Sequence, residues 1–313
     1  MINKKKNIIF LIGPTASNKT KLAIKLSQFL PIDLISVDSC LIYKELNIGI
    51  AKPSLQDLVV APHRLINIKN IKENYCVESF RKDALFEIEE ILSTNRIPLL
   101  VGGTMFYFNV LLNGLSLLPP RNDLVREKIL KDFSCKKKYS LYDKLIQIDP
   151  EISYKIHPND LQRIIRALEI YFISGNKMSD LIKFNNYEFP YNVIKFIVFP
   201  ESKDILHKRI ELRLKKMLSS GFKEEVEEVF LNNDVGCNVP GMKCLGYIDV
   251  YNYILGKITY DDMFFKILHS TKQLAKKQIT WLKSYRNCFW INSIKEEISI
   301  NFMIKNIQRI LKM

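Results

Sequence analysis

A polar loop near the start of the chain has the residue types and spacing of a phosphate-binding loop. It follows the apolar run 7–12 and leads into a segment whose apolar residues recur at helical spacing. Backbone N–H groups in such a loop form an anion-binding nest at the positive end of the helix. Lys19 adds a charge for a terminal phosphate, and the Thr20 hydroxyl can bind Mg²⁺. The pattern predicts a polyphosphate ligand, and its residues are Gly13, Pro14, Thr15, Ala16, Ser17, Asn18, Lys19 and Thr20.

Asn18 departs from the pattern G-x-x-x-x-G-K-[ST], which has a second glycine at this position. That glycine supplies backbone freedom, including positive φ. Asparagine is among the other residues that enter this region most readily, so we expect a working, slightly strained loop. The alternative is an ordinary turn before a helix that happens to begin with lysine.

Two polar residues stand where further strands are expected to end. Asp38 follows the run 32–37, and Thr104 follows the run 97–101 and two glycines. In parallel α/β sheets ligands collect at the carboxyl ends of the strands, so both residues could meet a ligand of the phosphate loop. Asp38 could equally close an Asx-turn, and Thr104 could cap the next helix. The residues alone leave these interpretations open.

The order of the elements predicts an α/β fold, a P-loop NTPase-like parallel sheet flanked by helices. Strands are expected at 7–12, 32–37, 65–68, 97–101, 191–199 and 288–291. Helices are expected behind the phosphate loop and at 77–94, 105–112, 202–220, 222–232 and 259–286, with an irregular loop at 42–53. We expect residues 1–119 and 191–313 to form this core.

Residues 120–190 are predicted to form an all-helical insertion domain. After Pro119-Pro120 the strand patterns disappear, and charged amphipathic patterns follow at 123–133, 139–148 and 161–174. Arg163 and Arg166 are at i, i+3 on one helix face, which suits phosphate or base contacts but also a solvated basic face.

Composition and charge limit the class of protein. The chain has 313 residues, 47% of them hydrophobic, and a formal net charge of +14. The charge suits a polyanionic partner, nucleic acid first, although a general lysine bias would also raise it. The six cysteines form no C-x-x-C pair and the four histidines do not cluster with them, which argues against zinc and disulfides. Free thiols fit a reducing cytosol, and no apolar stretch could span a bilayer, so we expect a cytoplasmic protein. We also expect a monomer.

Six segments resemble, in order, those of the bacterial tRNA dimethylallyltransferase (tRNA isopentenyltransferase) family. The resemblance covers nearly the whole chain, and the segments are GPTASNKT, DSCLIYKELNIGIAKP, VGGTMFYF, HPNDLQRIIRALEIYFISG, KCLGY and QLAKKQITWLK. It implies transfer of a dimethylallyl group from dimethylallyl diphosphate to N6 of the adenosine 3′-adjacent to the anticodon of tRNAs. The phosphate loop would then bind the diphosphate leaving group with Mg²⁺, and the partner would be the tRNA anticodon stem-loop.

The resemblance also implies roles for matching residues. Asp38 matches a general base that accepts a proton from the adenine amine, and Thr104 matches a hydroxyl that orients it. Arg126 matches an arginine that binds the diphosphate from the insertion. The residues that match tRNA contacts are Asp38, Ser39, Cys40, Leu41, Gln162, Arg163, Ile164, Ile165, Arg166, Lys243, Cys244, Leu245, Gly246, Tyr247, Lys276, Lys277, Gln278 and Lys283.

Two further residues depart from the family pattern, and other classes of protein share parts of it. Lys277 stands where arginine is common, and Ile248 stands where a basic residue is common. A P-loop kinase of a small molecule, or an adenylate isopentenyltransferase, needs no basic helical insertion. A non-catalytic RNA-binding P-loop protein would have no need of Asp38, Thr104 and Arg126 together. We therefore expect prenyl transfer to tRNA.

Overall fold

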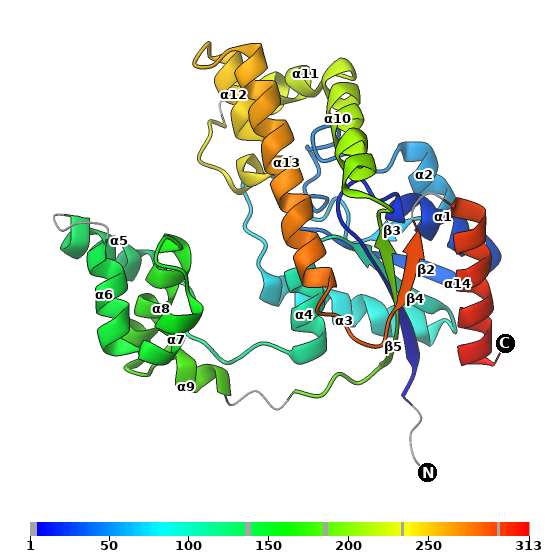
Figure 1. Cartoon of the computed structure of the whole chain (residues 1–313), viewed down its shortest axis with the longest axis horizontal. Helices are drawn as coiled ribbons and strands as arrows, with labels where there is room; N and C mark the ends of the chain where they lie inside the picture. Colours follow the sequence, from blue (N-terminus) through cyan, green and yellow to red (C-terminus); the bar gives the residue numbers. More distant parts are fainter. Residues whose placement is uncertain (1–4, 135–138, 184–186, 233–234, 293–294, 313) are drawn as a thin grey trace. The chain divides into compact units, whose positions relative to one another are not determined.

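Six parallel strands form the sheet that positions the phosphate loop, in a computed structural model of the chain (Figure 1). The structure describes residues 5–134, 139–183, 187–232, 235–292 and 295–312. Within these residues the strand order is β3-β2-β4-β1-β5-β6. The strands are β1 (Asn7–Ile12), β2 (Ile32–Val37), β3 (His63–Arg64), β4 (Ile97–Gly102), β5 (Asn192–Phe199) and β6 (Phe289–Asn292).

The register of the central strands brings their carboxyl ends to one edge. On β1, Ile12 lies opposite Gly102 of β4 and Ile197 of β5. The inner strands are buried on both faces, as a parallel sheet between helices requires. Because all the strands run in the same direction, the phosphate loop, Asp38 and Thr104 emerge at this common edge.

Helices cover both faces of the sheet (Figure 1). On one face, α1 (Lys19–Phe29) and α14 (Glu296–Leu311) share a buried cluster with alternate strand residues such as Leu11 and Leu99. On the other face lie α3 (Val77–Ser93) and α4 (Met105–Asn113), where the Phe10 and Phe108 rings are 4.9 Å apart between centroids. The alternation of Phe10 and Leu11 between the faces follows from the two-residue period of a strand.

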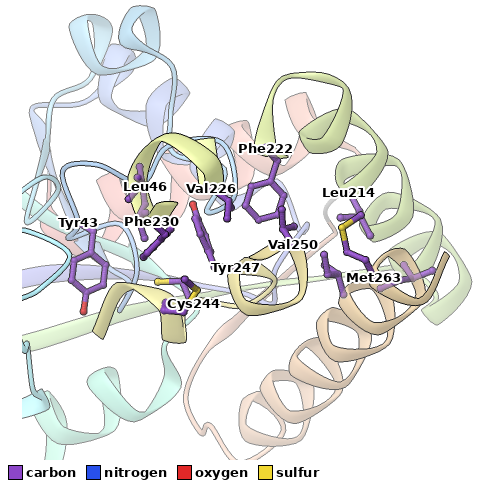
Figure 2. Close-up of a cluster of buried hydrophobic side chains, with 14 of the residues drawn as sticks. Tyr43, Leu46, Leu214, Phe222, Val226, Phe230, Cys244, Tyr247, Val250 and Met263 are labelled. Carbon is purple, nitrogen blue, oxygen red and sulfur yellow. The ribbon is translucent and has the colours of Figure 1, made fainter. Parts of the chain in front are cut away.

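A further group of helices packs beyond the carboxyl ends of the strands (Figure 1). They share a second buried cluster, part of which is drawn in Figure 2. The long loop after β2, which includes the short helix α2 (Leu55–Val60), also contributes to this cluster. Its helices are α10 (Lys203–Ser219), α11 (Phe222–Val226), the π-helix η1 (Glu227–Asn232), the 3₁₀ turn η2 (Pro240–Lys243), α12 (Tyr247–Ile254) and α13 (Tyr260–Leu282).

The chain divides into two compact units, which we call the sheet unit (1–111 and 190–313) and the helical unit (112–189). The helical unit has its own core, to which Leu145 and Leu168 contribute fully buried side chains. Its boundaries as a folding domain, expected at 120 and 190, stay a prediction. The described helices of this unit are α5 (Asp123–Ser134), α6 (Tyr139–Ile148), α7 (Pro150–Lys155), α8 (Leu161–Ser174) and α9 (Met178–Lys183).

Several expected elements differ in detail from the structure. The third strand was expected at 65–68 but lies at His63–Arg64, where two residues are too few to produce an alternating pattern. The short helices α2, α7 and α9 were not predicted, because six residues give little more than one turn of periodicity. The helix expected at 222–232 changes from α to π at Glu227. No helix within the described residues is long and apolar enough to cross a membrane.

Replacing Leu145 by alanine tests the core of the helical unit. The side chain is fully buried, so we expect the free energy of unfolding to fall by about 2–5 kcal/mol. The neighbouring Ile146, 42% exposed, provides the matched control, and Ile146→Ala should cost about 1 kcal/mol or less. Urea unfolding measures both, and equal losses would contradict the assigned core.

Candidate active site

The phosphate loop passes from β1 into α1 through two residues in the left-handed conformation. Ala16 has φ 59° and Asn18 has φ 63°. Asn18 directly precedes the first residue of α1, and the conformation expected from its type is confirmed. Its side chain makes no capping hydrogen bond, and no acidic residue lies in the first turn. The first N–H groups of the helix are therefore available to an anion.

Three charged side chains line a cavity beside this loop, namely Lys19, Asp38 and Arg213. Lys19 Nζ donates to Pro14 O at 3.2 Å, and Arg213 Nη1 donates to Thr15 Oγ1 at 3.4 Å. Burial lowers the pKa of Lys19 to about 8, while the Asp38 charge opposes this shift and the Arg213 charge adds to it. Two cations and one carboxylate leave an excess of positive charge, which suits a polyvalent anion.

Arg213 is a site residue that the sequence analysis did not predict. Burial lowers the pKa of its guanidinium, and its Nη2 also donates to Ile50 O at 3.4 Å. The helix α10 contains many basic residues, so composition does not distinguish this one. Its position does give a signal, because Arg213 falls beside Ile210 and Leu214 on the apolar stripe of the helix.

Asp38 fits both of the interpretations that the sequence left open. Its Oδ1 accepts hydrogen bonds from the N–H of Cys40 at 2.8 Å and of Leu41 at 3.3 Å. These bonds form an Asx-type turn that fixes the carboxyl group. Because both go to Oδ1, Oδ2 remains for a ligand in the cavity that Asp38 lines.

Thr104 lies beside the end of β2 but is not part of the cavity lining. Its N–H donates to Val37 O at 3.3 Å, and it directly precedes α4. Gly102 permits this close approach, since a Cβ there would lie 2.0 Å from Val37 O. The structure therefore places Thr104 next to the strand that positions Asp38.

The cavity has a volume of about 190 Å³ and a lining of two kinds. The charged and hydroxyl side chains described above make up one part. The other part is apolar and suits a small hydrocarbon group. It includes Ile50, Leu214, Met217, Leu245, Ile267 and Leu274.

Gln278 connects α13 to the phosphate loop. The Thr15 N–H donates to Gln278 Oε1 at 2.8 Å, and Gln278 Nε2 donates to Gly103 O at 2.8 Å. The side chain is buried, lines the cavity and positions the loop, while the contact with tRNA expected for it stays a prediction. Lys276 and Lys277 are on the exposed side of α13, whereas Gln278 faces the interior.

Three other residues expected to contact tRNA have side chains in hydrophobic cores. Ile164 belongs to the core of the helical unit, and Cys244 and Tyr247 belong to the cluster of Figure 2. These side chains are therefore buried in the structure, and the tRNA contacts expected of their segments stay a prediction. The resemblance covered whole segments, whereas only one side of each segment reaches solvent. The basic members of these segments that are exposed are Arg163, Lys243, Lys276, Lys277 and Lys283.

One buried carboxylate holds the loop segment 47–49 that borders the cavity. Glu225 Oε2 accepts from the N–H groups of Asn47 and Ile48 at 2.8 and 2.7 Å. Its Oε1 accepts from the Gly49 N–H at 3.0 Å and the Tyr247 hydroxyl at 2.7 Å. The loop is thus fixed by a charged group that satisfies three consecutive backbone donors.

Aromatic packing fixes the same loop from the other side. The rings of Phe222 and Tyr247 meet edge to face with centroids 5.0 Å apart (Figure 2). A Cβ at Gly49 would lie 2.1 Å from Phe222 Cε2. Since Gly49 lines the cavity, these rings help to set the shape of its wall.

Within the helical unit, Arg126 and Arg166 share one buried acid. Arg126 Nη2 and Arg166 Nη1 donate to Glu169 Oε2 at 2.9 and 2.6 Å. Burial opposes ionisation of Glu169, but the hydrogen bonds from both arginines lower its pKa to about 2. Arg163 is different, because its side chain is 71% exposed and its ion pair with Asp160 is 3.4 Å long. Arg163 and Arg166 were expected to act together on one helix face, but Arg163 is exposed whereas Arg166 is held by Glu169.

The residues around Thr20 fit a magnesium ion that is shared with a ligand. Within the described residues, no group of three or more His, Cys, Asp or Glu side chains could hold a metal. Mg²⁺ commonly takes few protein ligands and completes its shell with phosphate oxygens and water. Thr20 and Asp38 both offer oxygen atoms in the cavity.

The fold and this cavity define a parallel α/β protein with a phosphate-binding type of loop at the carboxyl edge of its sheet. Residues 41–285 match the family described as IPP transferase. The chain is 50% identical over 309 residues to a tRNA dimethylallyltransferase of Buchnera aphidicola subsp. Acyrthosiphon pisum (strain APS), covering 99% of this chain and 96% of the relative. The chain belongs to the IPP transferase family.

Solved structures agree with this assignment. The full-length tRNA isopentenylpyrophosphate transferase of Bacillus halodurans superposes with a TM-score of 0.70 at 29% identity, covering 99% of both chains. A eukaryotic dimethylallyltransferase acting on tRNA superposes with a TM-score of 0.76 at 25% identity. That match covers 93% of this chain and 74% of the eukaryotic one.

Replacing Glu225 by glutamine tests the support of the cavity wall. The amide cannot accept at both ends, so backbone donors of 47–49 lose partners, and we expect a loss of about 2–3 kcal/mol in unfolding free energy. The adjacent Glu224 is exposed, and Glu224→Gln should change stability by about 0.5 kcal/mol or less. Urea unfolding measures the stability of both variants, and hydrogen exchange measures the protection of the 47–49 amides. Equal stability and equal exchange rates in the two variants would contradict this role of Glu225.

Proposed function

We propose that this protein transfers a dimethylallyl group from dimethylallyl diphosphate to N6 of the adenosine 3′-adjacent to the anticodon of tRNAs. The products are N6-isopentenyladenosine and diphosphate. The observation that supports this most strongly is the cavity itself, which combines cationic groups, a fixed carboxylate and an apolar wall. Family membership and the tRNA-acting relatives support the same reaction.

The diphosphate would bind at the phosphate loop. The N–H groups of the first turn of α1, with Lys19 and Arg213, would stabilise the charge that develops as the leaving group departs. Mg²⁺ at Thr20 would supply further positive charge to the diphosphate oxygens. The apolar residues of the cavity, such as Ile50 and Met217, would hold the dimethylallyl group and exclude water from it.

Asp38 would act as the base. The adenine N6 forms a bond to C1 of the dimethylallyl group, which is the carbon that carries the diphosphate. The bond from C1 to the diphosphate oxygen breaks. The electron pair leaves with the diphosphate, and a proton of N6 passes to Asp38 Oδ2. Thr104 would orient the amine. Because N6 cannot reach the cavity while the adenine is stacked in the RNA, the adenosine would have to be extruded.

Arg126 is proposed to bind the diphosphate, as the family resemblance implies. Its Nη2 already pairs with Glu169, so the diphosphate would bind through the remaining N–H groups of the guanidinium. The exposed residues Arg163, Lys243 and Lys276 are proposed to contact phosphates of the anticodon stem-loop. A cytoplasmic location and a monomeric state remain part of the proposal.

The direct test is transfer of labelled dimethylallyl from its diphosphate to an anticodon stem-loop in the presence of Mg²⁺. We expect incorporation into the RNA that has adenosine 3′ of the anticodon, and none into free AMP. Incorporation into AMP instead would favour a free-nucleotide transferase, and absence of any incorporation would contradict the proposal.

Replacing Asp38 by asparagine separates the base from the turn. The amide oxygen still accepts from the Cys40 N–H, so the loop and RNA binding should remain. Single-turnover rates should fall by about 10²–10⁴, because the amide cannot take up the proton. A near-normal rate in Asp38→Asn would exclude Asp38 as the base.

Replacing Arg163 by alanine tests the RNA contact of the helical unit. We expect weaker tRNA binding and a salt dependence whose slope, in log K against log salt, falls by about 0.7–0.9, since one phosphate contact is lost. Arg166→Ala is the comparison, because it should lower stability by leaving the buried Glu169 with only one of its two arginine partners. Filter binding over a salt series measures the slopes, and an unchanged slope for Arg163→Ala would mean that this arginine is only solvated.

A further inference from the structure

Two buried polar atoms in the cavity lining have no hydrogen-bond partner within the part of the chain that the structure describes. They are Ser36 Oγ on β2 and His63 Nε2 on β3. Both residues line the cavity, and Ser36 is only 2% exposed. Buried polar groups are nearly always hydrogen-bonded, so two unpartnered atoms in one cavity point to a ligand that completes them.

The strand register places the two side chains on the same face of the sheet. His63 lies opposite Leu34, and Ser36 lies opposite Val101. Residues two apart on a strand share a face, so His63, Leu34, Ser36 and Val101 point to one side. This is the side covered by α1, since Leu34 and Val101 pack in the cluster of that helix. Thr20, in the first turn of α1, lines the same cavity.

The protonation of His63 determines what kind of ligand fits. Its Nδ1 is 2.8 Å from Ala61 O, and a carbonyl oxygen can only accept, so the proton is on Nδ1. Burial lowers the pKa of His63, although the bond to Ala61 opposes this. In the neutral ring Nε2 is then an acceptor. A ligand at this position has to donate a hydrogen bond.

This requirement excludes the oxygens of a fully ionised diphosphate as direct partners of His63, because they only accept. Water bound to a divalent cation does donate, and the cation makes it a stronger donor than free water. Mg²⁺ usually keeps several of its waters in protein sites, and side chains that bind those waters hold the ion indirectly.

We propose that Ser36 and His63 bind water molecules in the hydration shell of the divalent cation at Thr20, and so hold the cation against the diphosphate. The inference rests on the proposed function, which supplies the cation and the diphosphate. Ser36 and His63 are positioning residues here, since they act on the cation through water.

The test compares the affinity for dimethylallyl diphosphate in EDTA and in excess Mg²⁺, by calorimetry without tRNA. The ratio of the two dissociation constants measures how strongly the cation and the diphosphate support each other's binding. In Ser36→Ala and in His63→Gln we expect this ratio to fall about 10-fold, with the EDTA value unchanged. Ser93→Ala and His269→Gln, both at exposed positions, should keep the wild-type ratio.

Stability separates this role from a structural one. Because the Ser36 hydroxyl makes no hydrogen bond to any of the described residues, Ser36→Ala should not lower the melting temperature of the ligand-free protein. A marked drop in melting temperature would assign the hydroxyl to the fold and overturn the proposal.

A measurement on the wild-type protein avoids dependence on the variants' folding. The ¹⁵N resonance of His63 Nε2, identified among the four histidines by its absence in His63→Gln, should shift when Mg²⁺ is added to the diphosphate complex. An unmoved resonance would contradict the proposal.

The outcomes also separate the inference from the proposed function. If the wild-type protein binds dimethylallyl diphosphate more tightly with Mg²⁺ and both variants keep the full ratio, the inference is wrong and the proposed function stands. Equal weakening with and without Mg²⁺ would mean that the pair acts on the diphosphate, which also overturns the inference. If the wild-type protein does not bind this diphosphate at all, both fail.

Discussion

The site depends on two cations held in a cavity with a single carboxylate. Lys19 and Arg213 are both buried enough for the pKa of each to be lowered, and Asp38 opposes both shifts. One carboxylate cannot balance two positive charges, so the cavity is electrostatically incomplete without an anion. A diphosphate would supply the missing charge. The same arrangement would stabilise the diphosphate as it leaves, because the charges are already in place before the reaction begins.

Loops position these charges, and buried polar side chains from distant helices position the loops. Gln278 of α13 bonds the phosphate loop and the turn after β4 through its two amide atoms. Glu225 of α11 bonds three successive backbone N–H groups of the loop after β2. Each of these side chains forms hydrogen bonds with loop backbone groups that lie outside the strands and helices. The helices beyond the sheet are therefore needed to hold the cavity in shape.

The parts of this protein that follow from local patterns could be predicted from the sequence. The strand, loop and helix at 7–29 lie where the apolar periodicity placed them, and Asn18 has the backbone conformation that its type favours. Asp38 and the turn after β4 reach the cavity because parallel strands end at one edge. The two-residue strand β3 was misplaced, since it is defined by pairing with β2 and not by a pattern of its own.

The parts that depend on long-range packing could not be predicted. Arg213 is one of many basic residues on α10; its place beside the apolar stripe indicates that it turns inward, but only the packing of the helix shows which loop it contacts. Gln278 was named only as part of a segment that resembles tRNA contacts, and its hydrogen bond to the phosphate loop, 263 residues away in the sequence, leaves no local pattern. Arg166 was expected to share one helix face with Arg163, but it pairs with the buried Glu169 together with Arg126.

Proton uptake on binding dimethylallyl diphosphate is the most direct test of the electrostatic account. Near pH 9, above the Lys19 pKa of about 8, Lys19 is mostly neutral in the free protein, and the ligand's negative charge should return its proton. Calorimetry in buffers of different ionisation enthalpy should therefore detect uptake of close to one proton per ligand near pH 9, and almost none near pH 6.5. Lys19→Arg should abolish the uptake, because a guanidinium stays charged. Binding near pH 9 without proton uptake by the wild-type protein would show that Lys19 does not meet the diphosphate.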